Sequence, residues 1–233
     1  MTLVKTIALV TCFALLGGCT SPKFTEDASI DCNTRGVGAV LNGCDFTKAN
    51  LSESYFFRAD FSSAILTETN LTNTNLYFSY FKAADLTNAT LVNSGFAQAW
   101  FDGAVLSGAN ATKANFFGAS LFSAKLIGTN LTDAYMERSD MRYVDLTEAI
   151  LVKANISRAD LQAANLTRAD LRNAWIGFAY LAYANLTDAN LRMADLTNAD
   201  LRWSNLSGAD LNGAVLDGVL LEGATMPDGS IHP

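Results

Sequence analysis

The chain has 233 residues, a hydrophobic content of 50%, a formal net charge of −7 and a pI near 4.6. This hydrophobic content is sufficient for a continuous core. The only three prolines are at positions 22, 227 and 233, so no proline-containing linker divides the chain between them, and one folded domain is expected. The acidic charge argues against direct nucleic-acid binding, because phosphate neutralisation needs clustered Lys and Arg side chains.

Residues 1–18 are predicted to be an export signal peptide. Their only charged side chain is Lys5, and the apolar stretch 6–18 is too short to span a membrane and ends in small residues. The stretch runs into the sequence LLGGC, whose last residue is Cys19. This sequence resembles the lipobox of bacterial lipoproteins, which implies that Cys19 is lipidated and becomes the mature N-terminus. The alternative is an ordinary signal peptide cleaved nearby, with Cys19 incidental.

A five-residue repeat then runs without insertion over residues 39–226. Every fifth residue from Leu41 to Met226, which we call the central residue, is Leu, Phe, Met or Ile, with Ala111 as the single exception among 38 positions. The residue two places before it is small, most often Ala, and the residue directly before it is Asp or Asn in 21 of the 38 repeats. A period of five belongs neither to a helix nor to a strand, so the pattern predicts a chain that turns once per repeat.

Four such repeats would close a square coil of 20 residues. The central residue and the small residue would then point inward and stack on their counterparts one coil away, filling the interior. With coils separated by the strand spacing of about 4.8 Å, about nine and a half coils would form a rod of about 45 Å.

The repeats resemble a known family. Repeats such as ADLRN at 169–173 and ADLRW at 199–203 are similar to the A(D/N)LXX consensus of pentapeptide-repeat proteins. The resemblance covers residues 39–226 and implies an all-β fold, a right-handed quadrilateral β-helix. The ending GATMPDGS at 223–230 is similar to the closing sequence of cyanobacterial members.

The sequence therefore divides into a signal peptide (1–18), an anchor and cap segment (19–38), the β-helix (39–226) and a C-terminal tail (227–233). Cys44 stands at an inward position of the first coil, and Cys32 lies in the segment that must cover the open end. Because export leads to a compartment where disulfides persist, a bond between Cys32 and Cys44 would fasten the cap. The alternative is two separate thiols.

No catalytic, metal-binding or cofactor-binding constellation is predicted. The only histidine, His232, lies beyond the last repeat, so no His-based site is expected inside the rod. The Asp residues before the central position alternate freely with Asn, which favours hydrogen bonding to local backbone over a role for charge. A ladder of Thr residues one coil apart, at 47, 67, 87, 147, 167 and 187, needs no explanation beyond a strand-like surface.

The outward aromatic residues of the repeats fall on two adjacent sides of the predicted coil. The side with central residues 56, 76, 96 and their successors carries Tyr55, Phe57, Tyr77, Phe78, Phe117, Tyr135, Trp175 and Phe178. The side with central residues 61, 81, 101 and their successors carries Tyr80, Trp100, Phe122, Tyr143, Tyr180, Tyr183 and Trp203. Stacking between coils is one explanation. It gives no reason to spare the other two sides, so we expect an interaction surface for a protein partner, a second copy or a membrane surface.

These patterns predict a non-enzymatic, exported, lipid-anchored rod that binds or scaffolds an unidentified protein. The expected location is the periplasmic face of a bacterial membrane, or the thylakoid lumen if the source is cyanobacterial. The resemblance supplies an alternative, since some acidic family members are similar to B-form DNA in shape and charge and bind DNA gyrase. The export signal and the lack of a recognisable C-terminal dimerisation helix argue against that alternative.

Overall fold

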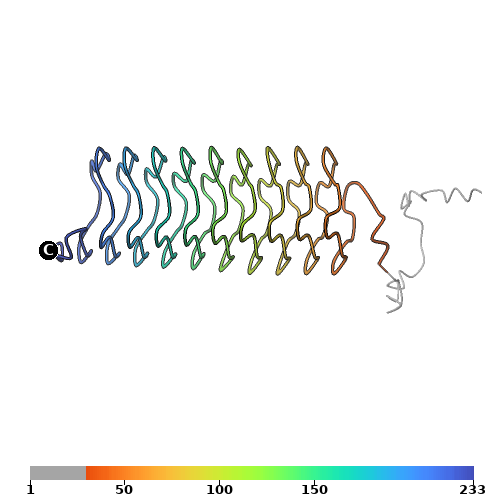
Figure 1. Cartoon of the computed structure of the whole chain (residues 1–233), viewed down its shortest axis with the longest axis horizontal. Helices are drawn as coiled ribbons and strands as arrows, with labels where there is room; N and C mark the ends of the chain where they lie inside the picture. Colours follow the sequence, from red (N-terminus) through yellow and green to blue (C-terminus); the bar gives the residue numbers. More distant parts are fainter. Residues whose placement is uncertain (1–29) are drawn as a thin grey trace, which may run out of the picture.

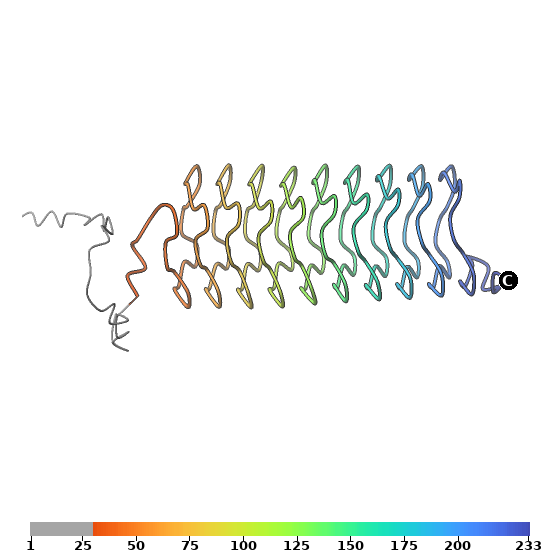
Figure 2. The ribbon, with the colours of Figure 1, turned by 180° about the vertical axis from the view of Figure 1, so that it is seen from behind.

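A computed structural model describes residues 30–233 of the chain. The chain forms a straight rod of stacked coils, with its C-terminus at one end (Figure 1). The view from behind shows the same regular stack of coils (Figure 2). The predicted signal peptide and the lipidation site at Cys19 lie outside the described residues.

Single-residue β-bridges hold neighbouring coils together. Each bridge joins the residue before one central position to the residue 20 places later in parallel orientation, from Val40 paired with Asp60 to Asn205 paired with Thr225. Over residues 30–233 there is no helix and no strand longer than one bridge residue. The predicted 20-residue period is therefore present, but the sheet-like sides of the rod consist of one bridge residue per turn.

The repeat at 144–148 illustrates how a repeat with Asp before its central residue pairs all five backbone N–H groups. Its five donors, in order, bond the carbonyls of Met141, Ala124 and Asn165, the side chain of Asp145, and the carbonyl of Thr167, at 2.7–3.2 Å. Three of these bonds join neighbouring coils, one closes the preceding turn, and one is made by a side chain. The buried donors, those of the small and central residues, are thus paired, which allows so narrow a rod to bury its interior.

Each repeat turns through a residue in the left-handed region of backbone space. The residue two places after every central position, from Gly43 to Gly223, has a φ between +53° and +72°. This pattern is that of a type II turn, which ordinarily prefers glycine there. Most of these residues are not glycine, and we did not predict their conformation from the sequence. The sequence does contain an indication of the positive φ. No Val, Ile or Thr occupies any of these positions, and β-branched residues tolerate a positive φ least.

The interior is packed with the inward residues that the repeat predicted. The central residues from Leu41 to Leu206 are buried, and so is Ala111, the exception to the pattern. Phe61, Phe81 and Phe101 stack along the rod axis, with ring centroids 5.1 and 4.7 Å apart. Inward Ser and Thr residues at the small position hydrogen-bond backbone carbonyls, and no buried side-chain N or O atom of the described residues lacks a partner.

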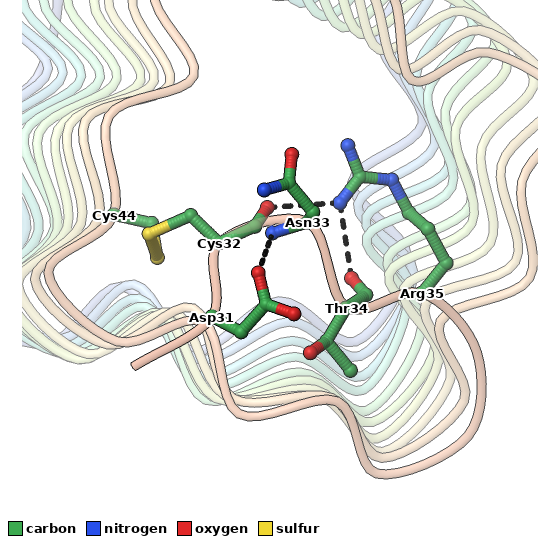
Figure 3. The surroundings of a disulfide bond; sticks show 6 residues. All are labelled: Asp31, Cys32, Asn33, Thr34, Arg35 and Cys44. Atoms are coloured by element: carbon green, nitrogen blue, oxygen red, sulfur yellow. Dashed lines mark hydrogen bonds between the residues drawn. A yellow bond between two sulfur atoms is a disulfide. The ribbon is translucent and has the colours of Figure 1, made fainter. Parts of the chain in front are cut away.

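A short cap covers the N-terminal end of the rod. Cys32 and Cys44 are joined by a disulfide, with their Cα atoms 5.7 Å apart. The guanidinium of Arg35 lies 5.7 Å from the ring centre of Phe46 and donates hydrogen bonds to the carbonyls of Cys32 and Thr34, each at 3.0 Å. Figure 3 shows these residues lying across the opening of the first coil. The cap therefore shields the aromatic end of the core with a cross-link and a cation.

The C-terminal end is more open. Leu216 and Leu220 of the last coil are exposed, and no further coil covers this end among the described residues. The tail folds back only over one side, where Thr225 forms an antiparallel bridge with Ile231 and His232 donates its backbone N–H to the carbonyl of Ala224 at 2.8 Å. The two ends of the rod are thus closed in different ways.

Candidate interaction faces

The four sides of the rod are named here by their first full-coil central residues: the 46 face, the 51 face, the 56 face and the 61 face. Residues 20 apart lie on the same face because the bridges connect them directly. All fifteen outward aromatic residues of the sequence analysis lie on the 56 and 61 faces. Twelve are exposed, whereas Phe57, Tyr77 and Phe117 are half-buried.

All outward aromatic residues in the N-terminal two-thirds of the rod except Tyr77 pair with one another. Tyr80 stacks on Trp100, with ring centroids 4.7 Å apart, and similar pairs join neighbouring coils elsewhere on both faces. The further pairs are Tyr55–Phe57, Phe57–Phe78, Phe117–Tyr135 and Phe122–Tyr143. Stacking between and within coils therefore gives these rings a structural role.

The last coils carry a different group, which we call the C-terminal aromatic patch: Trp175, Phe178, Tyr180, Tyr183 and Trp203. Among the described residues, none of the five has an aromatic partner, and their exposed fractions are 50–65%. The Trp203 ring lies over Gly223, where a Cβ atom would come within 2.2 Å of the ring. The patch is therefore the part of the two faces that ring stacking does not explain.

The 46 face carries a polar ladder in place of aromatic residues. On the 46 face, Thr167 donates its hydroxyl to Asn165 at 2.6 Å, and the amide of Asn185 donates to the Thr167 hydroxyl at 2.9 Å. The same links run from Asp145 to Ser207. Side chains that satisfy one another in this way make this part of the 46 face polar.

The Asp and Asn residues before the central positions are structural. All 21 of them accept a hydrogen bond from the backbone N–H two residues later. In these 21 repeats the Asx turn supplies the acceptor that the backbone does not provide. Asp and Asn serve equally because the acceptor is a carbonyl-type oxygen in both.

Some of these carboxyls gain a second partner. The guanidinium of Arg202 donates to Asp200 at 2.7 Å and lowers the pKa of that carboxyl, and Arg142 lowers the pKa of Asp140 in the same way. The Thr197 hydroxyl lowers the pKa of Asp195. All three carboxyls therefore stay charged to a lower pH than an ordinary Asp.

Few features of the described residues suggest chemistry. Within residues 30–233 there is no group of three or more His, Cys, Asp or Glu side chains placed to hold a metal ion, and no helix that could cross a membrane. His232 is the only histidine and lies in the tail, next to Ile231. One feature was not predicted from the sequence, a hollow on the 56 face centred on Gly177.

Comparison with known proteins identifies the repeats. The family model for pentapeptide repeats matches in 8 copies over residues 33–62, 54–93, 91–121, 119–158, 139–175 and 184–223. No curated protein sequence matches the chain. The crystal structure of HetL, a pentapeptide repeat protein involved in heterocyst differentiation regulation from the cyanobacterium Nostoc sp. strain PCC 7120, superposes with a TM-score of 0.83. It is 38% identical, over 84% of this chain and 88% of HetL.

A second solved structure shares the fold at low identity. Full-length QnrB1, a plasmid-mediated fluoroquinolone resistance protein, is 18% identical over 77% of this chain and 91% of its own, with a TM-score of 0.55. These matches confirm the predicted right-handed quadrilateral β-helix. The chain belongs to the pentapeptide-repeat family.

Proposed function

We propose that this chain is a non-enzymatic rod that binds or scaffolds another protein through its 56 and 61 faces, at the extracytoplasmic face of a membrane. The observation that carries the proposal is the confinement of exposed aromatic residues to these two adjacent faces, with the C-terminal aromatic patch unpaired. Aromatic side chains bury a large area with few rotamers to immobilise, and they are enriched at binding hot spots.

A purely structural explanation accounts for only part of the distribution. Ring stacking stabilises the coils up to Tyr143, but the same stabilisation would be available on the 46 and 51 faces, which have no outward aromatic residue. The side chains of the patch remain about half exposed or more. Leaving this apolar area in water is unfavourable, so a bound partner is the simplest reason for its presence.

The proposed role requires no catalysis. The repeats place Leu, Phe and Ala inside, and within residues 30–233 no group of His, Cys, Asp or Glu side chains is placed to hold a metal ion. HetL, which this chain resembles over most of its length, is involved in a regulatory process. A repeat rod that offers an extended surface and no catalytic group would regulate by binding another protein.

Replacing Trp100, Tyr180 and Trp203 together with Ser tests the role of the faces. Affinity capture from membranes in mild detergent should recover less partner with this variant, while circular dichroism shows an unchanged fold. The matched control replaces Thr87, Thr167 and Thr187 with Ser on the 46 face. Equal recovery of partner and equal oligomer size with both variants would show that the aromatic faces are structural.

The proposed location depends on Cys19. The LLGGC sequence supports lipidation, so Cys19→Ala should yield a soluble exported protein or an unprocessed precursor. Cell fractionation and a labelled fatty acid measure the outcome. Unchanged membrane association and electrophoretic mobility of Cys19→Ala would contradict lipid anchoring and leave the binding role of the faces as a separate question.

A further inference from the structure

The hollow on the 56 face lies inside the C-terminal aromatic patch. It has a volume of about 680 Å³, and its lining includes the buried Gly177 and the exposed Trp175 and Phe178 of the same repeat. Residues of the adjoining coils complete the rim: Glu137, Asn155, Ser157, Arg158, Asp195 and Thr197. Two aromatic walls therefore flank a position that has no side chain.

The backbone does not require glycine at this position. Gly177 is not among the residues with positive φ, and a Cβ atom there would lie at an ordinary 3.4 Å from the carbonyl oxygen of Thr197. Equivalent positions on the same face hold Phe57 and Phe117. Because larger side chains fit elsewhere in this column, the glycine is notable for the space that it leaves.

The two aromatic walls have different surroundings. The guanidinium of Arg158 lies 5.5 Å from the ring centre of Phe178, so this wall already binds a cation from the chain itself. Among the described residues Trp175 has no such partner, although tryptophan is the aromatic residue that binds cations best. Asp195 is the bridge partner of Trp175 and lies directly beside it.

Asp195 is the carboxylate of the hollow that remains available. Glu137 accepts a hydrogen bond from the Tyr135 hydroxyl at 2.7 Å and lies 3.6 Å from Arg138. Asp195 forms no ion pair within the described residues; its partners are the N–H and hydroxyl of Thr197. A carboxylate beside an unpaired tryptophan supplies both recognition elements of a cationic side chain.

Acidic charge is concentrated at the same end of the rod. Residues 175–233 contain seven Asp and Glu but only Arg192 and Arg202 as basic residues, so they carry −5 of the net charge. Both arginines are already paired, with Asp210 and Asp200 respectively. The rest of the described chain is close to neutral, because residues 30–174 contain 14 acidic and 12 basic side chains. A basic surface would therefore be attracted to this end.

We propose that the hollow receives an Arg or Lys side chain of a basic partner protein, with the cation stacked on Trp175 and paired with Asp195. The inference rests on the proposed binding role of the 56 and 61 faces and names the chemistry of the partner. The aliphatic part of the side chain would lie over Gly177, between the two aromatic walls. Its charged group would complete at Trp175 the arrangement that Arg158 already makes at Phe178.

The experiment uses the mature chain with Trp100 and Trp203 changed to Phe, so that Trp175 is the only tryptophan. The probe is an acetylated tetra-arginine amide, and its tetra-citrulline counterpart is the uncharged control of the same shape. Titration with the arginine peptide should change Trp175 fluorescence saturably, and the change should weaken as salt is added. The citrulline peptide should produce no comparable change.

Two further variants in this background locate the site. Asp195→Asn should weaken binding of the arginine peptide at least fivefold, and Gly177→Phe should block it by filling the hollow. Asp188→Asn is the matched control, since it removes the same charge from the same end of the rod but on the 46 face. It should change the affinity less than twofold.

Equal effects of Asp188→Asn and Asp195→Asn would show diffuse attraction and overturn the proposal, as would equal binding of the citrulline peptide. Absence of any saturable change, or unaltered binding by Gly177→Phe, would also overturn it. Thermal melting of each variant monitors the fold. The effects of Asp195→Asn and Gly177→Phe are measured against the Phe background and leave the rest of the two faces unchanged, so the hollow and the general docking role fail or succeed independently.

Discussion

The two ends of the rod both expose the core of a terminal coil, and they differ in how that core is covered. At the N-terminal end, a disulfide between Cys32 and Cys44 and the guanidinium of Arg35 cover the core. At the C-terminal end, a few backbone hydrogen bonds hold a tail over one side, and Leu216 and Leu220 stay exposed. A repeat whose coils contact only their neighbours has no long-range contact to protect its ends. The comparison implies that unfolding begins at the C-terminal end.

The largest expected effect comes from breaking the core between the two ends. Leu146→Asp places an unpaired charge in the buried column and should cost about 4 kcal/mol or more of unfolding free energy. Thr147→Asp, one residue further on the outer surface, should cost much less. Denaturant unfolding of both variants measures the difference. Similar losses would mean that the inward phase of the repeat is wrongly assigned.

Opening the N-terminal cap should have the next largest effect. The bond between Cys32 and Cys44 spans 12 residues, so Cys32→Ser should cost about 3 kcal/mol, chiefly by freeing the unfolded chain. Hydrogen exchange should then become faster in the first coil, and the starting point of unfolding should move to this end. A non-reduced digest of exported protein should contain the linked peptide, whereas two alkylatable thiols would contradict the bond.

Removing the tail should have a smaller and local effect. A chain that ends at Pro227 loses the bonds from Gly223 to His232, from His232 to Ala224 and from Met226 to Ser230. At about 1 kcal/mol for each net hydrogen bond, exchange protection of the last coil should fall, with little change at the N-terminal end. A large drop in global stability would show that the tail is as important as the cap.

The smallest expected effect is the loss of stability of the last coils at low pH. Beyond residue 190, hydrogen bonds lower the pKa of four carboxyls, those of Asp195, Asp200, Asp210 and Asp228. A carboxyl with a lowered folded-state pKa contributes stability above its ordinary value of 3.8 and loses that contribution as the pH falls toward the lowered pKa. Exchange measured from pH 5 down to pH 3 should therefore increase first in the last coils.

The Asp200→Asn variant serves as the control for this pH dependence. It keeps the acceptor for the Arg202 backbone N–H but removes the titrating charge, so the acid-induced loosening near Asp200 should become smaller. The same acid sensitivity in the variant would assign the effect to other groups.

The inward and outward positions in the middle of the rod were predictable, because the five-residue period assigns the same position to the same kind of residue in each repeat. The inward position of Leu146 and the backbone bond of Asp145 both follow from the period and from side-chain chemistry. The left-handed turn residues were not predicted, since Tyr183 and Trp203 are unusual at positive φ and only the missing β-branched residues indicated the constraint. The hollow at Gly177 was also missed, because its lining residues come from four successive coils.

The 20-residue register of the bridges also limits how such a chain can change length during evolution. Gain or loss of one whole coil leaves every later side chain on its face and alters only the reach of the rod. Gain of a single pentapeptide would preserve the core equally well, yet it would turn the whole downstream surface by a quarter of a revolution. An insertion before Trp175 would move it to the 61 face and carry Tyr180 to the 46 face. Duplication of a whole coil and duplication of a single pentapeptide are thus both compatible with folding, but only the first keeps the binding surface on the same faces.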